Sequence, residues 1–493
     1  MKESGILLHI SSLPSDCGIG TLGKEAREFA DFLSASGVTV WQVLPIGPTG
    51  YGESPYQSTS TFAGNPLFIS IQDLIDKGIF SGRSLPEKPV FTDPAAVDYE
   101  TVRKYKDSCL RVCFAECREK LHDAMNAFCN VQSWVRDFAL FTAVKKHFGE
   151  IMWTKWPDTA IRFRKPQALK QYSEMLKDEI EFVVFEQYLF DLQWNELKEY
   201  CNRSGIRIFG DIPIYVAEDS ADTWTHPEVF QLDKNRIPRR VAGVPPDLFT
   251  ADGQLWGNPL YRWHRLRLSG YGWWVARLRA LAARYDMIRI DHFIGFANYY
   301  SIPYGAPNAR NGKWVIGPGY KLFRVLKKKI PELNIVAEDL GCVNDRVRKL
   351  LRQCGYPGMK VLSFGFGGNH DENPHYPVHY TQNSVVYTGT HDNDTVIGWC
   401  MTADEDSLND ARACLQFHDI SEAPDAFIRK IYSSDCKLAV VPMQDLLGLD
   451  GKARMNYPGS VGGNWKWRLT PGQLNDSVRE KLTALNIEYV RKG

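Results

Sequence analysis

Four acidic side chains are placed where they could carry out chemistry, because each lies at or just beyond the end of a short, β-branched apolar run. These residues are Asp211, Asp291, Glu338 and Asp392. A carboxyl group can act as a nucleophile, a general acid or a general base. A lone aspartate at such a position often caps the following helix, but four acids at one edge would repel one another. We therefore predict that the four acids form a reactive site.

Alternation along the run Met287–Asp291 indicates which way its polar side chains point. Ile288 and Ile290 share one face, which suits a layer covered by helices, so Arg289 and Asp291 must face the interior. A neighbouring guanidinium favours the ionised form of a carboxyl group. We therefore expect a low pKa for Asp291 and an anion suited to act as a nucleophile.

The runs that end at Asp291 and Glu338 are separated by only one helix-like stretch, Tyr320–Lys329. They should therefore be neighbouring strands, about 4.8 Å apart. Retaining glycosidases place two carboxyl groups about 5–5.5 Å apart, whereas inverting ones need about 6.5–9.5 Å. The spacing favours a double displacement at a sugar.

The runs that carry the acids belong to a series of eight that alternate with helix-like stretches. The eight are Gly5–Ile10, Val38–Leu44, Ile206–Asp211, Met287–Asp291, Asn334–Asp339, Met359–Phe364, Ser384–Thr390 and Lys437–Met443. Such alternation is typical of the α/β class and predicts a parallel (β/α)8 TIM barrel. In this fold the chemistry lies at the C-terminal ends of the strands, where the acids fall.

A minimal barrel needs about 250 residues, so roughly half of the 493 residues must lie in insertions. We predict one catalytic domain, 1–493, with a helical subdomain inserted at 97–200. A second, loop-rich insertion at 216–272 has little periodicity and many Pro, Gly and Trp residues. Long loops in compact domains are usually functional, and this one is expected to cover the active site.

The composition excludes several classes of protein. Lys and Arg total 59 against 58 Asp and Glu, so bulk charge would hold neither nucleic acid nor an anionic membrane. We find no apolar stretch of roughly 18 residues and no signal-peptide core, and we expect a protein kept inside the cell. Cys109, Cys113 and Cys117 are interpreted as buried thiols on a helix face.

Motifs of other chemistries are missing from the sequence. It contains no GxGxxG after a strand, no GxxxxGK[ST] and no GxSxG. The main alternative at this stage is a metal-dependent barrel hydrolase that uses Asp291, His292, His391, Asp392 and Asp394.

Several segments, in order along nearly the whole chain, resemble the 4-α-glucanotransferases (amylomaltases or disproportionating enzymes) of the α-amylase superfamily. They are Ser4–Gly20, Leu44–Pro66, Pro245–Tyr261, Arg289–His292 (RIDH), Ala337–Gly341 (AEDLG), Thr388–Thr395 (TGTHDNDT) and Arg454–Trp465 (RMNYPGSVGGNW). One departure is His9-Ile10-Ser11, where the family commonly has His-Pro-Thr.

The resemblance implies a retaining transfer of α-1,4-glucan segments. Asp291 would be the nucleophile, Glu338 the general acid/base, and Asp392 would bind sugar hydroxyls and stabilise the transition state. The remaining residues implied to contact or position the substrate are Tyr56, Asp211, Asp247, Trp256, Asn258, Arg289, His391 and Asn464. No cofactor and no metal are implied.

The sequence thus predicts an enzyme that acts on malto-oligosaccharides and on starch or glycogen chains, in the cytoplasm or the plastid stroma. An α-glucan hydrolase with the same three acids is the alternative within the fold, and a catalytically inactive glucan-binding scaffold is the alternative from another class.

Overall fold

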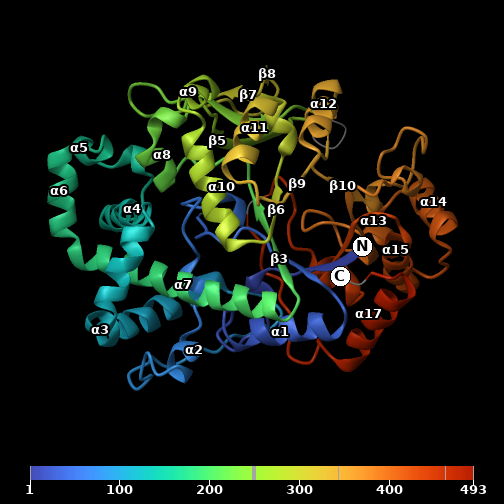
Figure 1. Cartoon of the computed structure of the whole chain (residues 1–493), viewed down its shortest axis with the longest axis horizontal. Coiled ribbons are helices and arrows are strands. Elements are labelled where there is room, and N and C mark those ends of the chain that lie inside the picture. Colours follow the sequence, from blue (N-terminus) through green and yellow to red (C-terminus); the bar gives the residue numbers. More distant parts are fainter. Residues whose placement is uncertain (1, 51, 247–250, 342, 461, 492–493) are drawn as a thin grey trace.

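The computed structural model describes residues 2–50, 52–246, 251–341, 343–460 and 462–491. Its centre is a sheet of eight parallel strands in the order β10-β11-β12-β1-β2-β3-β6-β9 (Figure 1). These strands are β1 (Glu3–Leu7), β2 (Val40–Gln42), β3 (Arg207–Ile212), β6 (Met287–Ile290), β9 (Ile335–Ala337), β10 (Gly358–Val361), β11 (Ser384–Tyr387) and β12 (Leu438–Pro442). Each of the eight predicted runs contains most or all of one of them.

The two edges of this sheet approach each other. The backbone N–H of Ala337 at the end of β9 donates a hydrogen bond of 2.9 Å to the carbonyl of Pro357, directly before β10. This contact brings the sheet close to a closed ring, and the predicted barrel is confirmed.

Strand register places the acids beside one another. Asp211 in β3 pairs with Arg289 in β6, and Ile290 at the end of β6 pairs with Ala337 at the end of β9. Asp291 and Glu338 are the next residues on these two strands, so the predicted pairing of their strands is confirmed.

Helices cover the outside of the barrel. They are α1 (Lys24–Ala35), α10 (Gly272–Arg284), α11 (Tyr320–Lys329), α12 (Asp345–Cys354), α13 (Val396–Thr402), α14 (Glu405–Leu415), α15 (Ala423–Ser433), α16 (Met443–Leu446) and α17 (Asp476–Glu488). Helix α11 has the predicted bounds. Helix α17 begins at Asp476, because the Asn475 side chain accepts a hydrogen bond from the N–H of Val478 and caps the helix there.

The connection between β2 and β3 is helical. It contains α2 (Ile71–Asp76), α3 (Tyr99–Val131), α4 (Val135–His147), α5 (Thr159–Arg162), α6 (Pro166–Met175) and α7 (Lys177–Arg203). Figure 1 shows α3 to α6 to one side of the barrel, with α7 running back towards it. Cys109, Cys113 and Cys117 on α3 are buried and free, in agreement with their interpretation as core thiols.

The segment at 216–272 contains more regular structure than predicted. Besides α8 (Ala221–Thr225) and α9 (Trp263–Leu268), it carries β4 (Arg240–Val244) and β5 (Gln254–Pro259). These strands join β7 (Asn298–Pro303) and β8 (Lys313–Ile316) in a four-stranded antiparallel sheet. The sequence pattern does not reveal β5 because four of its six residues are exposed or half-buried, without the alternation of a strand with one buried face.

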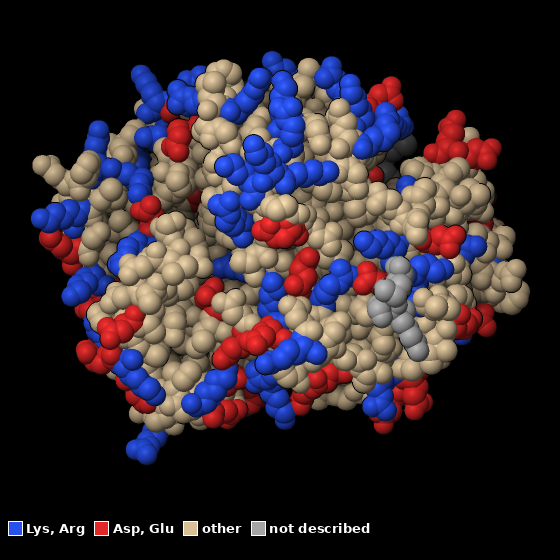
Figure 2. Space-filling model, viewed as in Figure 1, with Lys and Arg blue, Asp and Glu red and all other residues tan. Residues whose placement is uncertain are grey.

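Charge is spread over the surface in both signs. Figure 2 shows Asp and Glu interspersed with Lys and Arg on one face, with Lys and Arg more frequent over its upper part. Within the described residues, no helix is both long enough and apolar enough to cross a membrane.

Candidate active site

Arg289 is the centre of an ion-pair network at the C-terminal ends of β3 and β6. Its Nη1 lies 2.5 Å from Asp211 Oδ2 and its Nη2 lies 3.1 Å from Asp291 Oδ1. The Arg289 and Asp211 side chains are almost completely buried. The predicted interior orientation of Arg289 and Asp291 is confirmed.

The expected low pKa of Asp291 is wrong. Burial raises the pKa of this carboxyl well above its ordinary value, and the charges of Glu338, Asp211 and Asp392 raise it further. Arg289 lowers the pKa of Asp291, but this effect is smaller than that of burial. Arg289 is also paired with Asp211.

Glu338 is held by the backbone on the neighbouring strand. Its Oε2 accepts a hydrogen bond of 2.6 Å from the N–H of His292, and its Oε1 accepts one of 2.9 Å from the N–H of Leu340. His292 reaches this position with a left-handed backbone (φ 50°, ψ 45°). Burial raises the pKa of Glu338 to about 7, so this carboxyl can carry a proton near neutral pH.

Tyr56 contacts both Asp211 and His391. It lies in a short 3₁₀ helix (Pro55–Gln57) after β2, and its hydroxyl donates a hydrogen bond of 2.8 Å to Asp211 Oδ2. Its ring stacks on the ring of His391, with centroids 5.1 Å apart and planes at 13°.

Asp392 lies in the loop after β11, and its side chain is 41% exposed, the most accessible of the four acids. Its Oδ2 is 3.3 Å from His391 Nε2. Sequence reasoning missed two residues that hold it: Asn456 Nδ2 donates to Asp392 Oδ1 at 2.6 Å, and Arg454 Nη2 donates to the Asp392 carbonyl at 2.8 Å. Both lie in the segment Arg454–Trp465, which could have drawn attention to them.

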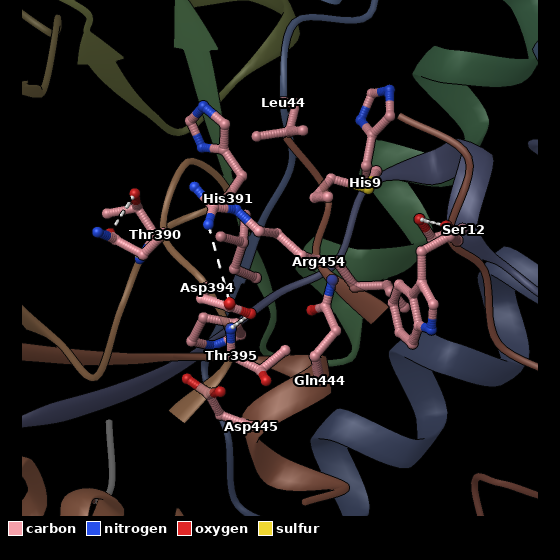
Figure 3. Close-up of a pocket in the computed structure, with 16 residues that line it drawn as sticks. His9, Ser12, Leu44, Thr390, His391, Asp394, Thr395, Gln444, Asp445 and Arg454 are labelled. Carbon is pink, nitrogen blue, oxygen red and sulfur yellow. Dashed lines mark hydrogen bonds and ion pairs between the residues drawn. The ribbon is translucent and has the colours of Figure 1, made fainter. Parts of the chain in front are cut away.

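A pocket next to this loop is lined by His9, His391, Asp394 and Arg454 among others (Figure 3). Burial lowers the pKa of His9 to about 3, with a smaller contribution from His391, and burial also lowers the pKa of His391. Both rings are therefore neutral at physiological pH, and His391 can donate or accept a hydrogen bond without adding charge.

The second insertion brings Trp256 next to His292, the residue that follows Asp291. Its ring lies edge-on to that of His292, with centroids 4.8 Å apart and planes at 88°. Asn258 is buried, and its Nδ2 donates to the carbonyl of Val216 at 2.9 Å. Asp247, another predicted contact in this insertion, lies outside the described residues.

Asn464 occupies a different environment from the other predicted contacts. Its Nδ2 donates to Ser460 Oγ at 3.0 Å, and its Oδ1 accepts from the N–H of Tyr457 at 3.1 Å. These bonds stay within its own loop and hold the shape of that loop.

In the part of the chain that the structure describes, no three His, Cys, Asp or Glu side chains come together as a group able to hold a metal ion. The metal-dependent alternative therefore lacks a candidate ligand set among these residues. Two carboxyl groups at adjacent strand ends of a parallel barrel, one buried and one half-buried, are suited to chemistry on a glycosidic bond.

Comparisons with known proteins identify the family. The 4-alpha-glucanotransferase family model matches residues 8–475. The chain is 44% identical over 493 residues to the 4-alpha-glucanotransferase of Streptococcus pneumoniae, covering 99% of this chain and 97% of that protein. It is 40% identical over 491 residues to the chloroplastic/amyloplastic 4-alpha-glucanotransferase of Arabidopsis thaliana, covering 98% and 84%.

The fold agrees with this result. The structure matches that of the amylomaltase from Streptococcus agalactiae in complex with acarbose with a TM-score of 0.96, at 39% identity and over 100% of both chains. The chain therefore belongs to the 4-alpha-glucanotransferase family, and the resemblance seen in its motifs is confirmed. It is an enzyme that transfers α-1,4-glucan segments.

Proposed function

We propose that Asp291 and Glu338 perform this transfer as nucleophile and general acid/base, on malto-oligosaccharides and on the chains of starch or glycogen. The observation that carries the proposal is their placement at the ends of two hydrogen-bonded strands, with one carboxyl beside a guanidinium and the other with a pKa of about 7. Because burial raises the pKa of both carboxyl groups, we expect the pair to retain a proton near neutral pH. We propose that this proton resides on Glu338, because the Arg289 guanidinium lies 3.1 Å from Asp291 and favours the anion there.

In the first step the Asp291 carboxylate attacks the anomeric carbon of the donor glucan. Glu338 gives its proton to the glycosidic oxygen, and that bond breaks to release the 4-hydroxyl of the leaving segment. The product is a β-linked glycosyl ester of Asp291.

In the second step the 4-hydroxyl of an acceptor glucan attacks the same carbon. Glu338 takes up the hydroxyl proton, the ester bond breaks, and an α-1,4 linkage forms again with Asp291 released as the anion. The two inversions give net retention.

Asp392 and His391 are proposed to bind hydroxyl groups of the sugar at the cleavage point. Asp392 is well placed for this role because its side chain is 41% exposed and Asn456 holds one of its oxygens. Hydrogen bonds to these hydroxyls stabilise the oxocarbenium-like transition state. Tyr56 and Asp211 are proposed to support Arg289 and to line the donor side.

Water competes with the acceptor at about 55 M, so transfer requires a covered site and an oriented acceptor. We propose that residues 216–272, with Trp256 near the nucleophile, supply this cover. The helical segment 97–200 is proposed to be an insertion within one catalytic domain, 1–493. The proposed location is the cytoplasm, or the plastid stroma as in the Arabidopsis relative, and no cofactor or metal is required for these steps.

Incubation of the purified protein with maltotriose alone tests the function. A ladder of longer maltodextrins together with glucose, without a gain in reducing ends, is expected. Glucose and maltose with rising reducing ends would identify the hydrolase alternative. A lack of any reaction would favour the inactive glucan-binding scaffold.

A further inference from the structure

A large cavity lies outside the catalytic site, between the helical insertion and the barrel helix α10. Its volume is about 1020 Å³, at the upper end of the range of ligand pockets. Its lining comes from α4 and α7 on one side and from α8, α9 and α10 on the other (Figure 1). The four acids of the active site are not among the lining residues.

One wall of this cavity is aromatic. The rings of Phe62 and Trp134 stack with centroids 6.2 Å apart and planes at 19°, and both side chains are half-buried. Trp273 on α10 also lines the cavity. Flat rings of this kind bury apolar faces while neighbouring polar groups make hydrogen bonds, and the C–H face of a pyranose ring offers such a surface.

A second feature is Arg284, a buried arginine at the end of α10 that lines this cavity. The residue is 9% exposed, and its guanidinium donates no hydrogen bond to any residue that the structure describes. It lies 6.0 Å from the Trp134 ring centroid. Buried arginines are normally paired, so five N–H donors without a protein acceptor indicate a ligand that supplies oxygen atoms.

Further polar groups on α7 face the same space. Asn195 Nδ2 donates to Asp191 Oδ2 at 3.0 Å, which leaves Asp191 Oδ1 available to accept from a hydroxyl. The combination of an arginine, a carboxylate and an amide beside an aromatic wall provides donors and acceptors for several hydroxyl groups.

The charge of the lining selects among ligand classes. It contains the acids Asp137, Asp191, Asp222 and Glu228 and the bases Arg265, Arg279 and Arg284. An anion such as phosphate would meet acids as well as arginines, whereas a neutral polyhydroxylated molecule can use both. We propose that this cavity is a second binding site for a segment of an α-glucan chain, an inference that rests on the proposed substrate class.

The cavity is connected to the catalytic rim through the loop that follows Tyr56. The N–H of Thr61 in this loop donates to Asp222 Oδ2 at 2.8 Å, and Asp222 lines the cavity. A polymer held there would keep its other chain ends close to Asp291 and raise their effective concentration. Short substrates gain nothing from such tethering.

The test compares a polymer with a short substrate. In Trp134→Ala, we expect the ratio of kcat/KM for glycogen to kcat/KM for maltotriose to fall about two- to twelvefold, the range for losing one aromatic contact. Asn195→Leu, at an exposed position that is safe for folding, should lower the same ratio. The matched control is Trp314→Ala, which removes a 45% exposed tryptophan from β8 outside both sites.

Calorimetric titration of Glu338→Gln with maltoheptaose provides the second readout. Two binding events are expected, and the added Trp134→Ala change should remove one. An unchanged glycogen ratio with a single binding event in the parent would overturn the second site. Inorganic phosphate that binds and is lost with Arg284→Lys, without binding of maltoheptaose, would also overturn it in favour of an anion site. Failure of the wild type to disproportionate maltotriose would instead refute the proposed function, because the titration does not depend on turnover.

Discussion

At the level of single residues, we propose that the reactivity of the site depends on which of two neighbouring carboxyl groups, buried Glu338 or half-buried Asp291, holds a proton. Burial raises the pKa of both Asp291 and Glu338, and only Asp291 touches a guanidinium. The backbone N–H groups of His292 and Leu340 lower the pKa of Glu338 but do not outweigh its burial. In the proposed steps, Glu338 supplies the proton at neutral pH, and these steps use no metal ion.

This arrangement predicts the pH dependence of the reaction. Glu338 must be protonated in the free enzyme, so kcat/KM should fall as pH rises through its pKa of about 7. The charge of Asp339 raises that pKa, so Asp339→Asn should move the alkaline limb to lower pH. The pH profile of maltotriose disproportionation measures both effects. An alkaline limb that begins only above about pH 9 would contradict the assignment of Glu338 as the acid.

Asn456 provides a second prediction at this scale. Its Nδ2 lies 2.6 Å from Asp392 Oδ1, so Asn456→Ala should lower kcat roughly tenfold or more while the thermal midpoint changes little. Asn456→Asp should be worse, because it places a like charge beside Asp392. Steady-state kinetics together with thermal melts separate these effects from misfolding. Asn126→Ala, at an exposed position on α3, is the control, and equal losses in both variants would refute the role.

At the level of elements, the barrel strands hold the acids while connections from distant parts of the chain complete the site. The loop after β11 presents His391 and Asp392, and β5 presents Trp256 beside His292. β5 is itself fixed by its pairing with β4 and, through β4, with β7. A sheet that the barrel topology does not require thus lies next to the segment that carries Asp291 and His292, and we propose that it covers this side of the site.

This cover predicts how the enzyme distinguishes acceptors from water. Trp256→Ala should raise the ratio of hydrolysis to transfer, because the site becomes more open to water and holds the acceptor less firmly. The ratio is measured as new reducing ends against glucose released from maltotriose. Trp314→Ala, in β8 of the same sheet, controls for disturbance of the sheet. A lower total activity with an unchanged ratio would refute the cover.

At the level of the whole molecule, Arg491 forms a hydrogen bond with the first strand, β1. Arg491 is fully buried, and its guanidinium donates to the carbonyl of Glu3 at 3.0 Å and to that of Tyr432 at 2.8 Å. Further bonds reach carbonyls between Ile431 and Cys436. This residue joins β1 to the helix before β12, two neighbouring parts of the barrel.

Loss of this contact should weaken the entire fold. We expect Arg491→Ala to lower the free energy of unfolding by about 3–5 kcal/mol, because buried carbonyl groups lose their donor and a cavity remains. Arg429→Ala is the control, since its side chain is 54% exposed and its pair with Glu488 should be worth at most about 1 kcal/mol. Denaturant unfolding of the two variants measures the difference. Equal destabilisation would refute a special role for Arg491.

The barrel and the positions of its acids could be predicted from the sequence. In the sequence, buried parallel strands are nearly continuous apolar runs. The residues that follow these strands lie at the same end of the barrel, so Asp291 and Glu338 could be placed on neighbouring strands. The motifs around them also indicated the family. These features depend on local pattern and chain order, which one sequence contains in full.

Features that depend on residues far apart in the chain became visible in the folded structure. The pKa of Asp291 follows from its burial and from the summed charges of Glu338, Asp211 and Asp392, so a single neighbouring arginine could not predict it. The contact between Asn456 and Asp392 joins residues 64 positions apart. The strand β5 and the cavity beside Arg284 likewise exist only where separate segments pack together, because burial and long-range pairing leave no periodic signal in the sequence.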